Sequence, residues 1–255
     1  MEQDIRASLQ LDSLPERVSH PSTALSLAGL VVLLLLLTLV RSWLKGPKGK
    51  SVLILGPCGS GKTTLFLQLR DSSIHQGTVA SMQENVDTIP IQLPNGSSKL
   101  VQLVDVPGHP RVRGKFRTYL DKTRGIIYIV DAVDFTPHKT ATAECRQLYE
   151  VLEQGLVRKR RMPVLLVCNK GDQGAKAHTT SFIQKQFEKE IDQLRSTRRT
   201  LGDSAAADLL PKADMPFTFE ALSKARGAQV SCCGASAKSG LYSFTRLGFS
   251  NDRMS

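Results

Sequence analysis

Three unbroken apolar runs, rich in branched side chains, punctuate the chain after residue 50. Each is five to seven residues long and is followed at once by glycine, proline or polar residues. A strand covered by helices on both faces has this composition, because neither of its faces meets water. The runs occupy residues 51–55, 125–131 and 163–168. They predict parallel strands at the centre of a sheet.

Other segments carry apolar residues on only one side. Residues 140–154 and 179–194 repeat them at helical spacing, which predicts two amphipathic helices. Residues 89–93 and 100–104 alternate apolar with polar positions around a Pro94-Asn95-Gly96 turn, which predicts a hairpin. The pattern as a whole indicates an α/β fold: a mostly parallel sheet with helices on both faces and one hairpin edge.

A long apolar stretch precedes this domain. No charged residue occurs between His20 and Arg41, and about twenty residues at 1.5 Å each span roughly 30 Å, the thickness of a bilayer core. We predict a single transmembrane helix over 24–44, after a short tail at 1–23 and before a tether at 45–50. Bases crowd the C-terminal flank, so the positive-inside rule places the following domain in the cytosol and the tail in a lumen.

The segment between the first predicted strand and the following apolar helix fits the phosphate-binding pattern G-x-x-x-x-G-K-[ST]. A glycine-rich turn lets successive backbone N–H groups point at an anion, and the helix N-terminus adds its positive end. Lys62 would reach the outer phosphates, and the Thr63 hydroxyl would hold Mg²⁺. The predicted phosphate-binding residues are Gly56, Pro57, Cys58, Gly59, Ser60, Gly61, Lys62, Thr63 and Thr64.

A second signal ends the strand at 100–104, where the chain reads Asp-Val-Pro-Gly-His. Asp105 is predicted to support the Mg²⁺ shell, and the Gly108 N–H to sense the terminal phosphate, because only glycine lets the backbone approach so closely. The polar stretch 71–87 would supply a further hydroxyl to the metal. Thr78 is the first choice there, with an ordinary loop threonine as the alternative.

The third signal is Asn169-Lys170-Gly171-Asp172, at the end of the strand over 163–168. The Asp172 carboxylate can accept two hydrogen bonds from guanine, whereas adenine offers no such donor pair. Asn169 would tie loops together near the base, and Lys170 would lie along it. The backbone of Ser236-Ala237-Lys238 would contact the guanine edge. GTP or GDP with Mg²⁺ is therefore the predicted ligand.

Charge and cysteine content narrow the setting. The net charge is +11, and bases cluster at 111–124, at 158–161 and at 195–199, which indicates an anionic neighbour. Anionic lipid and ribosomal RNA both remain candidates, whereas sequence-specific nucleic-acid recognition is not expected, since interleaved aromatic residues are absent. The five cysteines show no disulfide-scaffold or zinc spacing and are expected to be reduced thiols.

The order GPCGSGKT, DVPGH, NKGD and SAK resembles that of the P-loop small GTPases. A leading anchor, the histidine of DVPGH and an insertion at about 195–216 that ends before FTFEAL resemble the beta-subunit family of signal recognition particle receptors in particular, within the Arf/Sar-like branch. The resemblance implies a GTPase domain over 51–240 at the endoplasmic reticulum membrane. It further implies a heterodimer with the receptor alpha subunit, bound in the GTP state, for co-translational targeting of ribosome–nascent chain complexes.

Two features depart from common small GTPases. His109 stands where many have a water-orienting glutamine, so it is either a water-positioning residue or a partner contact, and hydrolysis is expected to be slow or partner-dependent. Residues 241–255 lack the helical period of the family's last helix and are expected to be an atypical tail. The alternatives are an Arf/Sar-like trafficking GTPase and a membrane scaffold with a GTPase fold that binds no nucleotide.

Overall fold

The computed structural model describes residues 49–71, 81–92, 96, 98–135, 140–200, 215–225 and 227–237. The chain divides into two units at 1–47 and 48–255, and every described residue belongs to the second unit. The anchor predicted over 24–44 lies outside the described residues, as do the tail at 241–255 and most of the insertion. Within the described ranges, no helix has both the length and the hydropathy that a membrane span requires.

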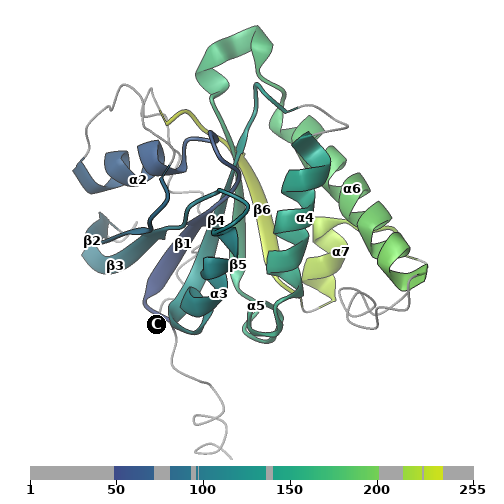
Figure 1. Cartoon of the computed structure of the whole chain (residues 1–255), viewed down its shortest axis with the longest axis horizontal. Helices are drawn as coiled ribbons and strands as arrows, with labels where there is room; N and C mark the ends of the chain where they lie inside the picture. Colours follow the sequence, from purple (N-terminus) through teal and green to yellow (C-terminus); the bar gives the residue numbers. More distant parts are fainter. Residues whose placement is uncertain are drawn as a thin grey trace, which may run out of the picture. The chain divides into compact units, whose positions relative to one another are not determined.

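A six-stranded sheet with the order β2-β3-β1-β4-β5-β6 organises the second unit (Figure 1). Five strands are parallel, and only β2 runs antiparallel, paired with β3 from Asn85↔Asp105 to Gln92↔Ser98. The α/β fold and the hairpin edge predicted from the sequence are thus confirmed. The elements are β1 Ser51–Leu55, α2 Lys62–Asp71, β2 Asn85–Gln92, β3 Ser98–Asp105, η1 Arg113–Lys115, α3 Phe116–Tyr119, η2 Leu120–Lys122, β4 Thr123–Asp131, α4 Thr140–Glu153, α5 Gly155–Lys159, β5 Pro163–Asn169, η3 Gly171–Lys176, α6 Thr180–Thr200, α7 Phe219–Lys224 and β6 Gln229–Gly234.

Alternate residues of the central strands feed two separate hydrophobic cores. Leu53, Leu55 and Tyr128 face one core, whereas Ile54 and Ile127 face the other, as the period of two requires. Helices α3, α4, α5, α6 and α7 supply side chains to the first core, and α2 supplies Leu65 and Phe66 to the second. Helices on both faces explain why the central runs are apolar throughout.

One helix is longer than the pattern predicted. The α6 helix continues to Thr200, into the range that the sequence assigned to the insertion. Arg195 accounts for the extra length: its side chain is buried, pairs with Asp192 at 2.9 Å and donates to the Met215 carbonyl at 2.5 Å. This contact attaches the last turns of α6 to the segment that precedes α7. The spacing of apolar residues along the sequence does not predict such a contact.

The parallel strands β1, β4 and β5 all end at the same edge of the sheet, where the predicted signals lie. Strand β1 can leave the sheet there only through a glycine. Gly56 has φ +140°, and a Cβ atom at that position would lie 2.1 Å from the Ile129 carbonyl oxygen. The close approach of two backbones therefore fixes the start of the phosphate-binding loop.

Candidate nucleotide site

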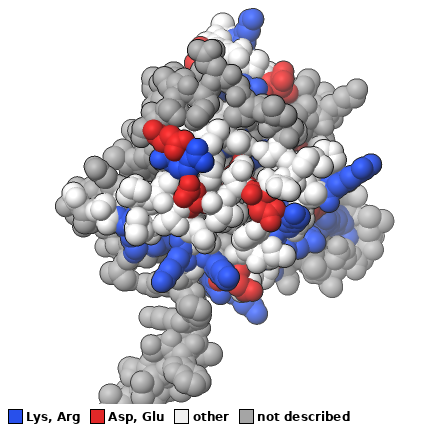
Figure 2. Space-filling model, turned by 60° about the vertical axis from the view of Figure 1, so that its left-hand side comes forward, with Lys and Arg blue, Asp and Glu red and all other residues white. Residues whose placement is uncertain are grey.

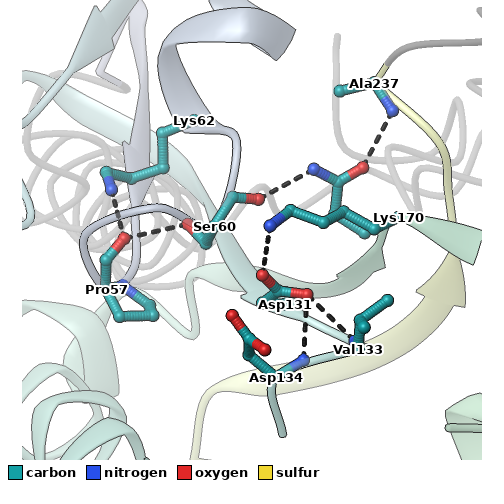
Figure 3. Close-up of polar contacts among 9 residues, drawn as sticks. Pro57, Ser60, Lys62, Asp131, Val133, Asp134, Lys170 and Ala237 are labelled. Atoms are coloured by element: carbon teal, nitrogen blue, oxygen red, sulfur yellow. Dashed lines mark hydrogen bonds and ion pairs between the residues drawn. The ribbon is translucent and has the colours of Figure 1, made fainter. Parts of the chain in front are cut away.

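The loop between β1 and α2 folds around its own lysine. The Lys62 ammonium donates to the Pro57 carbonyl at 2.5 Å, and the Ser60 hydroxyl donates to the same oxygen at 3.0 Å (Figure 3). Lys62 is 6% exposed, and burial lowers its pKa, with the charge of Asp105 acting in the opposite direction. The site thus contains a desolvated cation whose main partner is a neutral carbonyl, which is a favourable setting for an anion.

The side chains of Thr63 and Asp105 are hydrogen-bonded to each other, and we call this pair the metal corner because both could act as oxygen ligands of a metal ion. The Thr63 hydroxyl donates to Asp105 Oδ2 at 2.7 Å, and the Asn85 side-chain amide donates to the same oxygen at 3.1 Å. Asp105 Oδ1 is buried and has no hydrogen-bond partner among the described residues, and burial raises the carboxyl pKa. An orphaned carboxylate oxygen beside a hydroxyl fits Mg²⁺, which takes oxygen ligands and keeps several waters or phosphate oxygens.

The hydroxyl that reaches this corner from the following loop belongs to Ser81. Its Oγ lies 3.3 Å from Thr63 Oγ1, at the start of the segment that leads into β2. Thr78, the residue chosen from the sequence, lies outside the described residues. Asn85, which the sequence reading did not consider, joins the same cluster. No local pattern separates these side chains from ordinary loop residues, since their role depends on where β2 pairs with β3.

Gly108 lies against the phosphate loop. A Cβ atom there would be 2.6 Å from the Gly56 carbonyl oxygen and 2.7 Å from the Lys62 ammonium. Glycine is therefore required by space, in agreement with the predicted close approach of this backbone. His109 follows, half-buried, and its Nδ1 accepts from the Arg111 backbone N–H at 3.3 Å. Its role in positioning water stays a prediction.

Asn169 connects three segments that are far apart in the sequence. Its Nδ2 donates to the Ser60 carbonyl at 2.8 Å, and its Oδ1 accepts from the Ala237 backbone N–H at 2.8 Å. Figure 3 shows Ser60 of the phosphate loop and Ala237 of the segment after β6, with dashed lines marking these two hydrogen bonds. Both hydrogen bonds are buried, so they stabilise the arrangement more than exposed ones would. This geometry matches the tie between loops expected of Asn169.

Asp172 and Lys170, which lie close to Asn169 in the sequence, are also fixed by side-chain contacts. The Ser236 hydroxyl donates to Asp172 Oδ1 at 2.6 Å, which joins the NKGD and SAK segments. Lys170 has φ +68° and forms an ion pair with Asp131 at the end of β4, while Asp131 Oδ1 accepts from the Val133 N–H at 2.9 Å. The sequence reading missed Asp131, although it ends a buried strand as Asp105 does. Lys238 lies outside the described residues.

A buried carboxyl of α4 borders the same site. Glu144 is 5% exposed, and within the part of the chain that the structure describes its Oε2 has no hydrogen-bond partner. Burial raises the Glu144 pKa to about 8, the charge of Asp131 adds to the increase, and Lys62 opposes it. Helical periodicity places a glutamate on one face of α4 but does not reveal that its carboxyl is buried and interacts electrostatically with Asp131 and Lys62.

Two loops that flank the metal corner are also joined. Glu84, just before β2, accepts from the Lys115 ammonium at 3.1 Å and from the Tyr119 hydroxyl at 3.1 Å. Arg113 of η1 pairs with Glu150 of α4 at 3.7 Å. A ligand that displaced either loop would therefore also disturb the contacts of the other loop and of α4.

Comparison with known proteins identifies the family. The family model described as the signal recognition particle receptor beta subunit matches residues 47–225. The chain belongs to the family of signal recognition particle receptor beta subunits. It is 33% identical to the rat (Rattus norvegicus) receptor subunit beta over 221 residues, which cover 83% of this chain and 80% of the relative.

Solved structures agree with this family and with the sheet. The structure of the mammalian SRP receptor aligns with a TM-score of 0.63 and 30% identity, covering 74% of this chain and 92% of that chain. The receptor subunit SRb-GDP from Chaetomium thermophilum aligns with a TM-score of 0.54 and 24% identity, covering 76% and 91%. The second similarity supports the fold. The resemblance stated from the four motifs is thus confirmed at the level of the family.

Proposed function

We propose that this chain is the membrane-anchored, GTP-binding subunit of a signal recognition particle receptor. The observation that carries the proposal is the position of Asn169, hydrogen-bonded to both the phosphate loop and the segment after β6. With Asp172 held by Ser236, the base-recognising carboxylate stands in a fixed frame. The relative from Chaetomium thermophilum is described with GDP, which is consistent with this assignment.

Different groups of residues would bind the phosphates, the metal ion and the base. Backbone N–H groups of residues 58–64 and the Lys62 ammonium would hold the phosphates, which would replace the Pro57 carbonyl as the lysine's partner. Thr63 and Asp105 would hold Mg²⁺, and Ser81 is proposed in place of Thr78 as the hydroxyl from the following loop. Bound Mg²⁺ would neutralise charge on the outer phosphates. Six residues would surround guanine: Asn169, Lys170, Asp172, Ser236, Ala237 and Lys238.

The finer function concerns location and partner. The anchor over 24–44 would hold the domain at the endoplasmic reticulum membrane, with the domain in the cytosol. The loops joined by Glu84 and Lys115 would form the surface that binds the receptor alpha subunit in the GTP state. That heterodimer would support co-translational targeting of ribosome–nascent chain complexes, and slow hydrolysis, with His109 positioning water, would reset it.

Nucleotide titration tests the base assignment. Calorimetry with Mg²⁺ is expected to detect GTP and GDP binding by the wild-type chain in detergent. Asp172→Asn is expected to lose guanine affinity by about 10³-fold and to gain affinity for xanthosine nucleotides, because the new amide can donate where the carboxylate accepted. Asp121→Asn, an exposed carboxylate at the opposite end of the sheet, is the matched control. Absence of heat from the folded wild-type chain with either nucleotide would favour the nucleotide-free scaffold.

Partner capture tests the receptor assignment. The full chain, loaded with GTP or GDP, is mixed with purified receptor alpha subunit in detergent. Retention of alpha by the GTP-loaded chain, reduced by GDP and by Lys62→Ala, is the expected result. Equal retention in all three states would contradict nucleotide-dependent assembly while leaving guanine binding intact.

A further inference from the structure

Basic residues gather at the edge of the sheet opposite the nucleotide site. The strands β1, β4 and β5 begin there, and the chain segments before them are in contact. The Ser51 hydroxyl donates to the Lys122 carbonyl at 2.7 Å, and the Arg160 guanidinium donates to the Asp121 carbonyl at 2.7 Å. Gly49 packs so closely on η2 that a Cβ atom would lie 2.3 Å from the Lys122 carbonyl oxygen. Three segments distant in sequence thus form one surface.

The structure separates these bases from the other basic clusters. Arg113, Lys115 and Arg198 form ion pairs with carboxylates, so their charge is largely neutralised within the fold. At the opposite edge, Arg160 donates to the Asp121 carbonyl, whereas four other bases form neither an ion pair nor a side-chain hydrogen bond with any described residue. These four define the basic edge: Lys50, Lys122, Arg124 and Lys159. Figure 2 shows Lys and Arg gathered along the lower border of the visible face, with most acidic side chains above them.

One of these bases lies at an irregularity in strand pairing. Ser51 pairs with Thr123 and Val52 with Gly125, so Arg124 is the extra residue of a bulge at the start of β4. A bulge at a strand end redirects a side chain that would otherwise point into a core. Lys159 ends α5, and Lys50 and Lys122 are exposed. The acidic residue among them is Asp121, so the edge has a clear excess of positive charge.

We propose that the basic edge lies against anionic headgroups of the membrane that holds the anchor. The proposal rests on the anchor over 24–44 that is part of the proposed function. Six residues, 45–50, join that anchor to β1, and fully extended they reach about 20 Å. The edge from which β1 starts is therefore the part of the domain that the tether holds nearest the bilayer. Surface potential from anionic lipid acts over about 8 Å, and a tether that can extend no further than about 20 Å lets the bases of this edge enter that range repeatedly.

Contact through this edge leaves the nucleotide site accessible. Asp105 and Asn169 end their strands, whereas Ser51 and Thr123 begin theirs, so the site and the basic edge lie at opposite ends of the sheet. A domain that rests on its basic edge presents Gly108 and the loops of Glu84 and Lys115 to the cytosol. Lipid is favoured over ribosomal RNA because the covalent tether supplies the lipid surface at the edge itself, whereas RNA would have to approach between domain and bilayer.

Lysine labelling of the reconstituted full chain tests the proposal. The chain is placed in phosphatidylcholine vesicles, with or without about 30% phosphatidylserine, an anionic lipid of the class that attracts bases. A membrane-impermeant acetylating reagent is added, and acetylation is quantified by mass spectrometry after digestion that does not depend on lysine. Labelling of Lys122 and Lys159 is divided by that of Lys176, an exposed lysine in η3 at the nucleotide end. This ratio cancels the fraction of domains facing inward.

The expected result is a ratio about threefold lower in anionic vesicles, restored by about 1 M salt because the Debye length falls to about 3 Å. Lys122→Gln combined with Lys159→Gln should raise Lys50 labelling in anionic vesicles toward its value in neutral ones. Lys185→Gln with Lys189→Gln, two exposed lysines of α6, is the matched control and should leave Lys50 protected.

Equal labelling ratios in neutral and anionic vesicles would overturn the proposal. If added ribosomes then lower the ratio, the basic edge contacts ribosomal RNA rather than lipid. Release of the chain from vesicles by alkaline carbonate overturns the anchor and the basic-edge contact together. Guanine binding in detergent is measured on the same preparation, so loss of the nucleotide assignment is distinguished from both.

Discussion

The two ends of the nucleotide site are built differently. At the end proposed to bind the base, Asn169 and Asp172 are fixed by hydrogen bonds of 2.8, 2.8 and 2.6 Å to other segments of the chain. At the phosphate end, Lys62 and Thr63 are engaged with Pro57 and Asp105 of the chain itself. The contacts at the phosphate end occupy the atoms that a ligand would need, whereas those at the base end leave the frame in place.

This difference assigns separate tasks to the two ends. We expect the base end to contribute to folding and to specificity, since its hydrogen bonds join chain segments without using the atoms proposed to contact the phosphates. The phosphate end must exchange internal contacts for external ones, so it is where binding can alter the flanking loops. Substitutions at the base end should therefore reduce stability, and substitutions at the phosphate end should reduce affinity with little loss of stability.

Asn169→Ala should have the largest effect. It leaves the Ser60 carbonyl and the Ala237 N–H without their buried partner, and about 1–3 kcal/mol is lost for each such group, so unfolding should require about 3 kcal/mol less. Urea denaturation of the nucleotide-free chain in detergent measures this. Asn85→Ala, the matched control at the phosphate end, removes one partly buried bond to Asp105 and should cost about 1 kcal/mol. Equal losses would contradict the difference between the ends.

Lys62→Ala should produce the opposite outcome. The charged hydrogen bonds of a lysine to phosphate contribute about 1.5–3 kcal/mol, so affinity for GTP should fall by roughly 10- to 100-fold. Stability should change by less than about 1 kcal/mol, because removal of a buried cation also removes its desolvation penalty. Fluorescent-nucleotide titration and urea denaturation measure the two quantities. A loss of stability as large as that of Asn169→Ala would mean that Lys62 supports the empty fold.

Gly108→Ala sharpens the comparison within the phosphate end. The added Cβ would lie 2.6 Å from the Gly56 carbonyl oxygen, so the loop must move away from the position where its N–H meets a terminal phosphate. GTP affinity should fall by about tenfold, the equivalent of about 1.4 kcal/mol, and GDP affinity by less. Gly114→Ala is the control, since a Cβ there has no atom within 4 Å. An unchanged ratio of GTP to GDP affinity would rule out a phosphate-sensing role for Gly108.

Much of the base end was predictable from sequence, and less of the phosphate end. Asn169, Asp172 and Ala237 follow strands that apolar runs identify, and parallel strands bring their ends to one edge. Ser81 and Asn85 could not be ranked, since their loop has no periodicity and depends on how β2 pairs with β3. Sequence patterns identify residues at strand ends, whereas packing alone identifies those in irregular loops.

Helix surfaces were the second source of omissions. Glu144 reads as one polar residue on α4, and only the packing of α4 against the sheet shows that its carboxyl is buried beside the site. Arg195 reads as part of a polar insertion, but its buried side chain continues α6. Hydropathy predicts that Glu144 and Arg195 are exposed to solvent, but both side chains are buried in the fold. Burial of a charged residue depends on packing between elements, which a hydropathy pattern does not encode.

Glu144→Gln gives the smallest and most specific effect. Burial raises the Glu144 pKa from 4.5 to about 8, so between these values the folded chain binds a proton that the unfolded chain has lost. Stability from this group is therefore fully present below about pH 4.5 and declines as pH rises toward 8. Because Gln does not titrate, the variant should lose less stability than the wild type between pH 5 and pH 9.

Urea denaturation at several pH values measures that difference directly. Subtraction of the variant's profile from that of the wild type removes the contributions of Lys62 and Asp105, whose pKa values are also shifted by burial. The exposed Glu220, changed to Gln, is the control and should leave the wild-type slope in place. If Glu144→Gln keeps that slope as well, the carboxyl is ionised in the folded chain. The phosphate end would then hold a buried negative charge that favours Lys62 and opposes an incoming phosphate, and Glu144→Gln should then bind GTP more tightly than the wild type.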